Sequence, residues 1–81
     1  MKLFKATVLV GGENKSAQQP RLLSMLAYAK NYAQAEQMAD KASGGIARGI
    51  LIEEGPAEMP VNVEQRVLHG VTFYVERRVL R

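Results

Sequence analysis

The chain has 81 residues, with 11 Lys and Arg against 8 Asp and Glu, a net charge of +3 and no Cys. This length predicts one domain, residues 1–81, with a modest core, which excludes multidomain enzymes. Because the chain has no Cys, disulfide frameworks, zinc–thiolate centres and thiol nucleophiles are excluded, and a reducing, cytoplasmic location is expected. No apolar run is long enough for a membrane span, so we expect no membrane association.

Residues 2–10 show the two-residue alternation of a β-strand. One face carries the apolar side chains Phe4, Ala6, Val8 and Val10. The other face carries Leu3, Lys5, Thr7 and Leu9. Turn-forming residues at 11–14 and the polar stretch up to Pro20 are long enough for the chain to reverse, so we expect a hairpin.

Residues 21–43 allow two interpretations. In the first, residues 22–29 form a strand and a helix begins at Asn31, a good N-cap that is followed by Gln34 and ended by the glycines at 44 and 45. Its apolar stripe consists of Tyr32, Ala35, Met38, Ala39 and Ala42. In the second, one long helix runs from Pro20 to Ser43, because the segment lacks Val, Ile and Thr and is rich in helix-forming residues. The N-cap and the stripe favour the first.

The last part of the chain contains two more predicted strands. Residues 46–54 alternate and end before Gly55-Pro56, and residues 55–65 are expected to form an exposed loop with no packing pattern. From Arg66 to Arg78 we expect one long strand, in which Gly70 marks a bulge or a bend.

The alternation of this long strand assigns its side chains to two faces. Val67, His69, Val71, Phe73 and Val75 are expected toward the core. Leu68, Thr72, Tyr74, Glu76 and Arg78 are expected on the opposite face.

Together these elements predict an α+β fold: a small, mostly antiparallel sheet with one helix on one face, in the order β-β-α-β-β. The alternative with one long helix has the order β-α-β-β. In the favoured fold the helix covers Phe4, Ala6, Val8, Met25, Ala27, Ile50, Ile52, Val71 and Phe73.

The sheet face away from the helix is unusually apolar. A sheet covered by helix on one side ordinarily carries polar side chains on the other. Here the alternation places apolar residues there, namely Leu3, Leu9, Leu22, Leu26, Tyr28, Leu68 and Tyr74. Such a patch is typical of an interface. We expect a protein partner, or a second copy in a homodimer, to bind through Leu22, Leu26, Tyr28 and Tyr74.

The sequence offers little for catalysis. Its glycines lack the spacing of phosphate-binding loops, and no second histidine accompanies His69 to hold a metal or complete an acid–base pair. We expect His69 to be a partly buried structural residue, and Glu53, Glu54 and Glu58 to be solvated. No catalytic residue, cofactor or metal site is predicted, and we expect the protein not to be an enzyme.

A second functional hypothesis is direct nucleic-acid binding. Aromatic and cationic side chains on one sheet surface hold single strands by base stacking and phosphate contact. The candidate residues are Lys5, Tyr28, Lys30, Tyr74 and Arg78. The small net charge and the acidic residues among them favour a protein partner instead.

The segment Ala29-Lys30-Asn31-Tyr32-Ala33-Gln34-Ala35-Glu36 is similar to the central segment of several small bacterial and phage proteins. The order of a hairpin, a helix and two strands also resembles that of some small anti-CRISPR proteins carried by phages. The resemblance implies a non-catalytic phage or mobile-element accessory protein that docks on a host nucleic-acid-handling protein complex and modulates or inhibits it. Such families share no fixed binding motif, so the resemblance assigns no functional residue.

Overall fold

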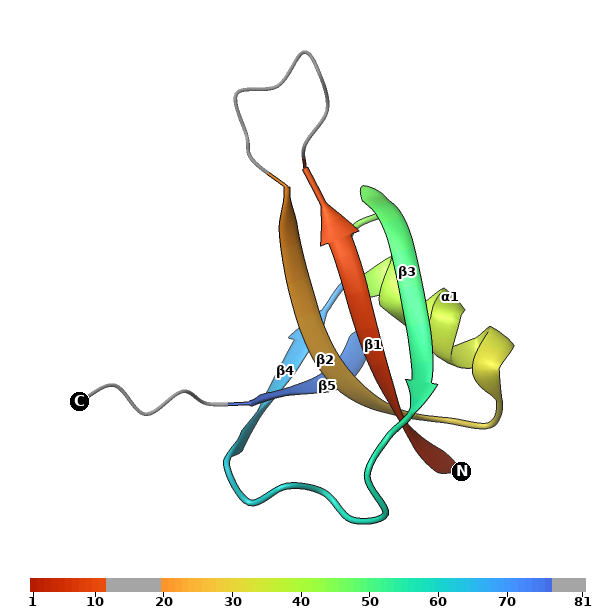
Figure 1. The fold of residues 1–81 in the computed structure, drawn as a ribbon, viewed down its shortest axis with the longest axis vertical. Helices are drawn as coiled ribbons and strands as arrows, with labels where there is room; N and C mark the ends of the chain where they lie inside the picture. The colour runs from red at the N-terminus through yellow and green to blue at the C-terminus, as the bar shows by residue number, and fades with distance from the viewer. Residues whose placement is uncertain (12–19, 77–81) are drawn as a thin grey trace, which may run out of the picture.

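The computed structural model describes residues 1–11 and 20–76 (Figure 1). Over these residues the elements are β1 (Lys2–Val10), β2 (Arg21–Ala29), α1 (Tyr32–Ala42), β3 (Ala47–Glu54), β4 (Val63–Leu68) and β5 (Val71–Glu76). The strands form one five-stranded antiparallel sheet in the order β3-β1-β2-β5-β4, and α1 packs on one of its faces. The predicted α+β class is confirmed, with one strand more than expected.

The helix begins and ends where the sequence predicts. Asn31 has an extended backbone, and its Oδ1 accepts a 2.8 Å hydrogen bond from the Gln34 N–H, while the Gln34 side chain accepts one from the Lys30 N–H. At the other end, Gly44 and Gly45 both have positive φ, and their N–H groups donate back to carbonyls of the last turn, as in a Schellman motif. The alternative of one long helix is therefore wrong, because residues 21–29 are paired in the sheet. In the described ranges α1 is the longest helix, and it is too short to cross a bilayer.

β1 is an interior strand of the sheet, second from the β3 edge. It pairs with β2 on one side and β3 on the other, so that Phe4 lies between Ala27 and Glu54. The predicted strands at residues 2–10, 22–29 and 46–54 are confirmed to within one residue. Most of the predicted turn after Gly11 lies outside the described residues.

The core lies between the sheet and α1. The buried helix residues are all alanines, Ala35, Ala39 and Ala42, and such small side chains let the helix approach the sheet closely. The predicted core is confirmed, since Phe4, Ala6, Val8, Met25, Ala27, Val71 and Phe73 are buried and Ile50 and Ile52 pack against them. Tyr32 packs edge-on against Phe4 with ring centroids 4.9 Å apart.

The predicted single strand from Arg66 is wrong, because the chain reverses at His69-Gly70. Both residues have positive φ, 51° and 79°, as in the type I′ turn that joins two-residue hairpins. The reversal joins β4 to β5. As a result, residues before the turn lie on the opposite sheet face from the one expected for a continuous strand. Leu68 pairs with Val71 on the helix side, and Val67 pairs with Thr72 on the outer face, which we define as the sheet face opposite α1.

These observations correct the predicted positions of three side chains. Leu68 does not belong to the outer face, Val67 does not face the core, and His69 is exposed in the turn instead of partly buried. Residues 77 and 78 of the predicted strand lie outside the described residues.

The chain between β3 and β4 also differs from the expectation. These two strands lie at opposite edges of the sheet, so residues 55–62, which we call the crossover, must pass the other three strands (Figure 1). The Gly55 N–H donates a 2.9 Å hydrogen bond to the Leu3 carbonyl oxygen, and Leu3 is buried. The predicted loop is exposed over most of its length, but its last residues, 63–65, belong to β4. The contact of Gly55 with Leu3 corrects the expected lack of packing, and Leu3 is not exposed as expected.

The helix start provides the first testable prediction. Replacing Asn31 by Ala removes the oxygen that accepts the Gln34 N–H, and we expect a loss of about 1 kcal/mol in the free energy of unfolding. For a domain of this size that loss lowers Tm by roughly 4–8 °C. Asn31→Asp keeps an accepting oxygen and should unfold close to the parent temperature. Thermal unfolding followed by circular dichroism measures both, and equal losses in the two variants would contradict the capping role.

Candidate functional site

The outer face is the surface that the helix leaves uncovered. Strand register aligns Lys5, Leu26, Tyr74 and Gln65 across neighbouring strands β1, β2, β5 and β4. Because their sequence neighbours Phe4, Met25 and Phe73 are buried in the core, these four side chains lie on the side away from α1.

Three of the four predicted partner-binding residues come together on this face. Leu26 lies directly opposite Tyr74, and the Tyr28 ring meets the Tyr74 ring edge-to-face with centroids 6.2 Å apart. Tyr28 is 41% exposed. Leu22, which is 69% exposed, lies on the same face but about 13 Å along β2 from Leu26. The structure thus forms a compact cluster of Leu26, Tyr28 and Tyr74, which we call the outer-face cluster, and Leu22 lies apart from it.

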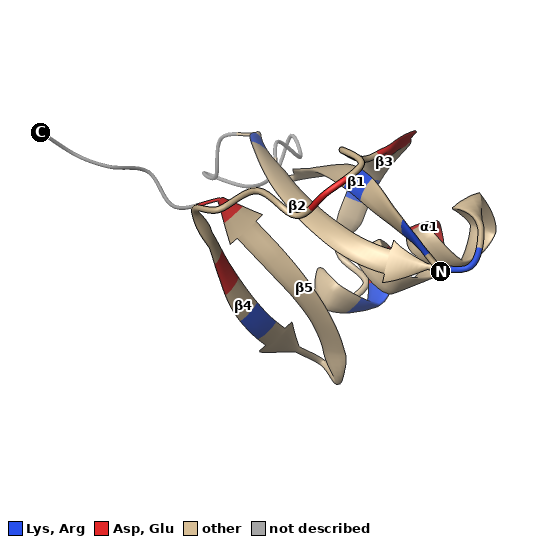
Figure 2. Ribbon diagram, turned by 90° about the horizontal axis from the view of Figure 1, so that it is seen from below, with Lys and Arg blue, Asp and Glu red and all other residues tan. Residues whose placement is uncertain are grey.

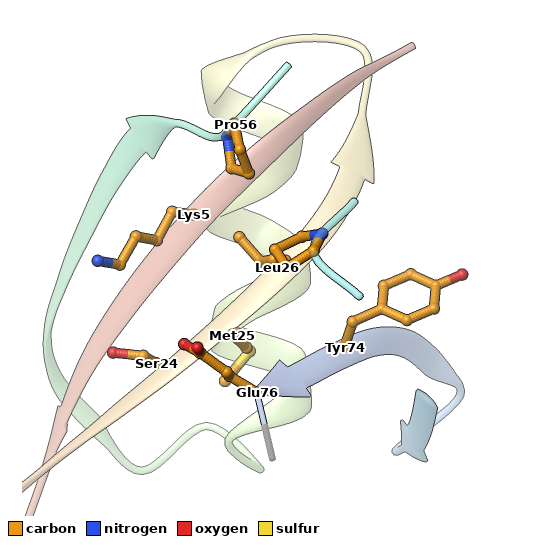
Figure 3. A pocket seen from close by; sticks show the side chains of 8 residues that line it. Lys5, Ser24, Met25, Leu26, Pro56, Tyr74 and Glu76 are labelled. Carbon is orange, nitrogen blue, oxygen red and sulfur yellow. The ribbon is translucent and has the colours of Figure 1, made fainter. Parts of the chain in front are cut away.

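A hollow of about 180 Å³ opens beside this cluster (Figure 3). It lies where β2 and β5 meet, and these strands are paired only at Leu26 and Tyr74 among the described residues. Since the strands diverge on either side of that pair, the sheet is open there, and the hollow is lined by Lys5, Ser24, Met25, Leu26, Pro56, Pro60, Tyr74 and Glu76. Met25 comes from the core side, whereas the two prolines come from the crossover.

Sequence reasoning missed several residues of the hollow. Ser24, Met25, Pro56, Pro60 and Glu76 were not among the predicted site residues. The alternation had placed Glu76 on this face without marking it as part of a site. No local pattern predicts that Pro56 and Pro60 reach the hollow, because the crossover passes there only through the placement of β3 and β4 at opposite edges. The prolines gave a signal for a stiff connection, and nothing in the alternation showed which surface that connection would border.

The charges of the outer face are mixed. Lys5 lies directly opposite Glu53 on β3, and it shares the hollow with Glu76. Figure 2 shows acidic and basic positions interspersed over the described ribbon. The exposed ion pair of 3.4 Å between Lys2 and Glu54 lies on the other side of the sheet, since Glu54 is paired with the buried Phe4. The face therefore presents apolar surface with a rim of both signs, where exposed pairs contribute little to stability.

The structure brings together only part of the predicted nucleic-acid set. Lys5 and Tyr74 line the hollow and Tyr28 contacts Tyr74. Lys30 is exposed at the corner between β2 and α1, where its backbone N–H donates to Gln34. Arg78 lies outside the described residues.

His69 lies away from the outer-face cluster. It occupies the β4–β5 turn near the end of the helix, where a Cβ added at Gly44 would lie 3.2 Å from the His69 Nε2. Residues 1–11 and 20–76 contain no group of three or more His, Asp or Glu side chains placed to hold a metal ion.

Comparison of the chain with protein-family models, with curated proteins and with solved structures found no match. The layout-level resemblance to small phage proteins therefore carries no family assignment, and the functional argument depends on the surface itself.

The contact between the crossover and β1 provides the second prediction. A Cβ added at Gly55 would lie 3.0 Å from the Leu3 carbonyl oxygen, so Gly55→Ala must displace the backbone beside the hollow. We expect a loss of about 1–3 kcal/mol in the free energy of unfolding. At Gly49 the nearest atom to an added Cβ is 3.9 Å away, so Gly49→Ala is the matched control and should stay within about 1 kcal/mol of the parent.

Denaturant unfolding of both glycine variants measures this difference. Equal stability of Gly55→Ala and Gly49→Ala would contradict the close contact between Gly55 and the Leu3 carbonyl oxygen.

Proposed function

We propose that this protein is a non-catalytic binding module that docks on a partner protein through its outer face. One observation supports the proposal: the edge-to-face pair of Tyr28 and Tyr74 borders a hollow on a sheet face that the helix leaves uncovered. In this proposal an apolar side chain of the partner enters the hollow, and the surrounding rim of polar and charged residues orients it.

The size of the hollow favours a single side chain over a free ligand. Pockets for drug-sized ligands measure roughly 300–1,000 Å³. A cavity of about 150 Å³ in another protein is sufficient for benzene. At about 180 Å³ the hollow therefore matches one aromatic or aliphatic side chain. Such an anchor in a pocket is typical of the centre of a protein–protein interface.

The residues around the hollow suit the same role. Tyrosine offers a large contact area with few rotatable bonds, so ordering it on binding costs little entropy. Tyr28 is 41% exposed and Leu22 is 69% exposed. Docking would remove the apolar surface of both side chains from water, which is favourable. Lys5 and Glu76, on the rim, can select a partner that presents charges of both signs.

The sequence analysis supplies one extension of this proposal and one competing outcome. The resemblance to small phage proteins points to a host nucleic-acid-handling complex as the partner and to inhibition as the effect. Direct nucleic-acid binding is the competing outcome, and it differs in salt dependence, because phosphate contacts release counterions and weaken steeply as salt rises.

Two tyrosines of similar exposure provide a matched test. Tyr28 on the outer face and Tyr32 on the helix side are 41% and 52% exposed, and each packs edge-on against one aromatic ring. We expect Tyr28→Ser to weaken binding of the partner at least about tenfold, since buried interface tyrosines are frequent hot spots. Tyr32→Ser should bind like the parent.

The measurement begins with extract of the source cell, with and without nuclease treatment. A partner retained by the parent protein is identified, purified and titrated against the parent and both variants at low and high salt, with thermal unfolding as the check on folding. Equal affinity of Tyr28→Ser and the parent would overturn the proposal. Capture that disappears after nuclease treatment, with a steep salt dependence, would support direct nucleic-acid binding instead.

A further inference from the structure

The two edges of the sheet differ in how open they are. β3 forms one edge, where the register shifts at Leu9/Val10 and the Arg48 guanidinium donates to the Gly11 carbonyl oxygen. Bulges of this kind protect an edge from pairing. β4 forms the other edge, and its pairing with β5 is regular from Val63 to Leu68. Val67 and Leu68 there are 59% and 47% exposed.

The β4–β5 turn defines which backbone groups of β4 have no partner within residues 1–11 and 20–76. In a two-residue type I′ turn the flanking residues form a hydrogen-bonded pair, here Leu68 and Val71. Hydrogen-bonded and non-hydrogen-bonded pairs alternate along an antiparallel ladder. The N–H and C=O groups of Val63, Gln65 and Val67 therefore point away from β5, toward the open edge.

We propose that β4 is a self-pairing edge, which binds β4 of a second copy of this chain antiparallel about a two-fold axis at Gln65. In this register Gln65 lies opposite Gln65 of the second copy, and Val63 lies opposite its Val67. All these residues direct their backbone groups at the open edge, so each such pair exchanges both of its N–H···O bonds. On the outer face the pairing joins two apolar pairs around a central pair of amides.

The charges of β4 select this register. Glu64 lies opposite Arg66 of the second copy, in a non-hydrogen-bonded pair where side chains approach most closely. The salt bridge of 3.4 Å within each strand shows that both side chains already project on one side, and Figure 2 shows the acidic and basic positions close together on β4. A slip of the pairing by two residues in either direction places Glu64 opposite Glu64 or Arg66 opposite Arg66, which is unfavourable.

The dimer would also change how the outer face works. A two-fold axis perpendicular to the sheet keeps the two outer faces on the same side of one continuous sheet. Two hollows would then face the same direction, and a partner with two binding segments could engage both, which raises the apparent affinity. The β4 edge and the outer-face cluster are separate surfaces, so the self-pairing does not depend on the proposed function.

Charge reversal tests the register directly. Glu64→Arg places like charges opposite each other at both positions of the pair, and Arg66→Glu does the same with the opposite sign. We expect each variant alone to dimerise about tenfold more weakly than the parent. An equimolar mixture of the two should form a heterodimer, because every charge then faces its opposite. The double variant Glu64→Arg/Arg66→Glu should dimerise like the parent.

Analytical ultracentrifugation of the full chain over a concentration series into the millimolar range measures these species, with circular dichroism as the folding check. Tyr28→Ser is the control on the outer face and should leave the dimer unchanged. The proposal is overturned by a parent that stays monomeric throughout, by a dimer that neither charge reversal weakens, by the absence of a heterodimer in the mixture, or by a dimer that Tyr28→Ser abolishes.

Discussion

A single helix can cover only one face of a five-stranded sheet, and the surfaces of this protein follow from that constraint. The helix presents Ala35, Ala39 and Ala42 to the sheet, so it lies close and contributes little bulk of its own. Large side chains of the strands, above all Phe4 and Phe73, fill the core from the other side. No comparable layer covers the outer face over the described residues, where only the crossover borders one part of it.

The weak junction between β2 and β5 links the core to this surface. Antiparallel strands that are paired over their full length leave no space between them, whereas these two are paired at Leu26 and Tyr74. The sheet twists away on either side of that pair, and Met25 is left between the core and the hollow. The same divergence places the β4–β5 hairpin away from the rest of the sheet (Figure 2). β4 is then an edge strand that is paired regularly with β5 and carries opposite charges at Glu64 and Arg66.

Much of the fold was predictable because its signals are local. The alternation of residues 2–10 and the Asn31 cap with its Gly44-Gly45 stop each depend on neighbours within one or two turns of chain. The aromatic part of the site followed from the same alternation, since Tyr28 and Tyr74 were placed on one face. The failures lie after residue 54, where the crossover packs on β1 and where a two-residue turn at His69-Gly70 interrupts an apolar run without any change in its period. That turn exchanged the faces expected for Val67 and Leu68.

The sequence by itself determined the class of fold, the strands at residues 2–10 and 46–54 and an apolar outer face, and it favoured the observed bounds of the helix over one long helix from Pro20. Only the tertiary structure decided that β5 lies beside β2, that the crossover buries Leu3 and walls the hollow, and that β4 is an open edge. The physical reason is that alternation records which side of a strand meets the core and carries no information on which strand lies next to it. Neighbours in the sheet are selected by contacts between residues far apart in the chain, and those contacts exist only once the chain has folded.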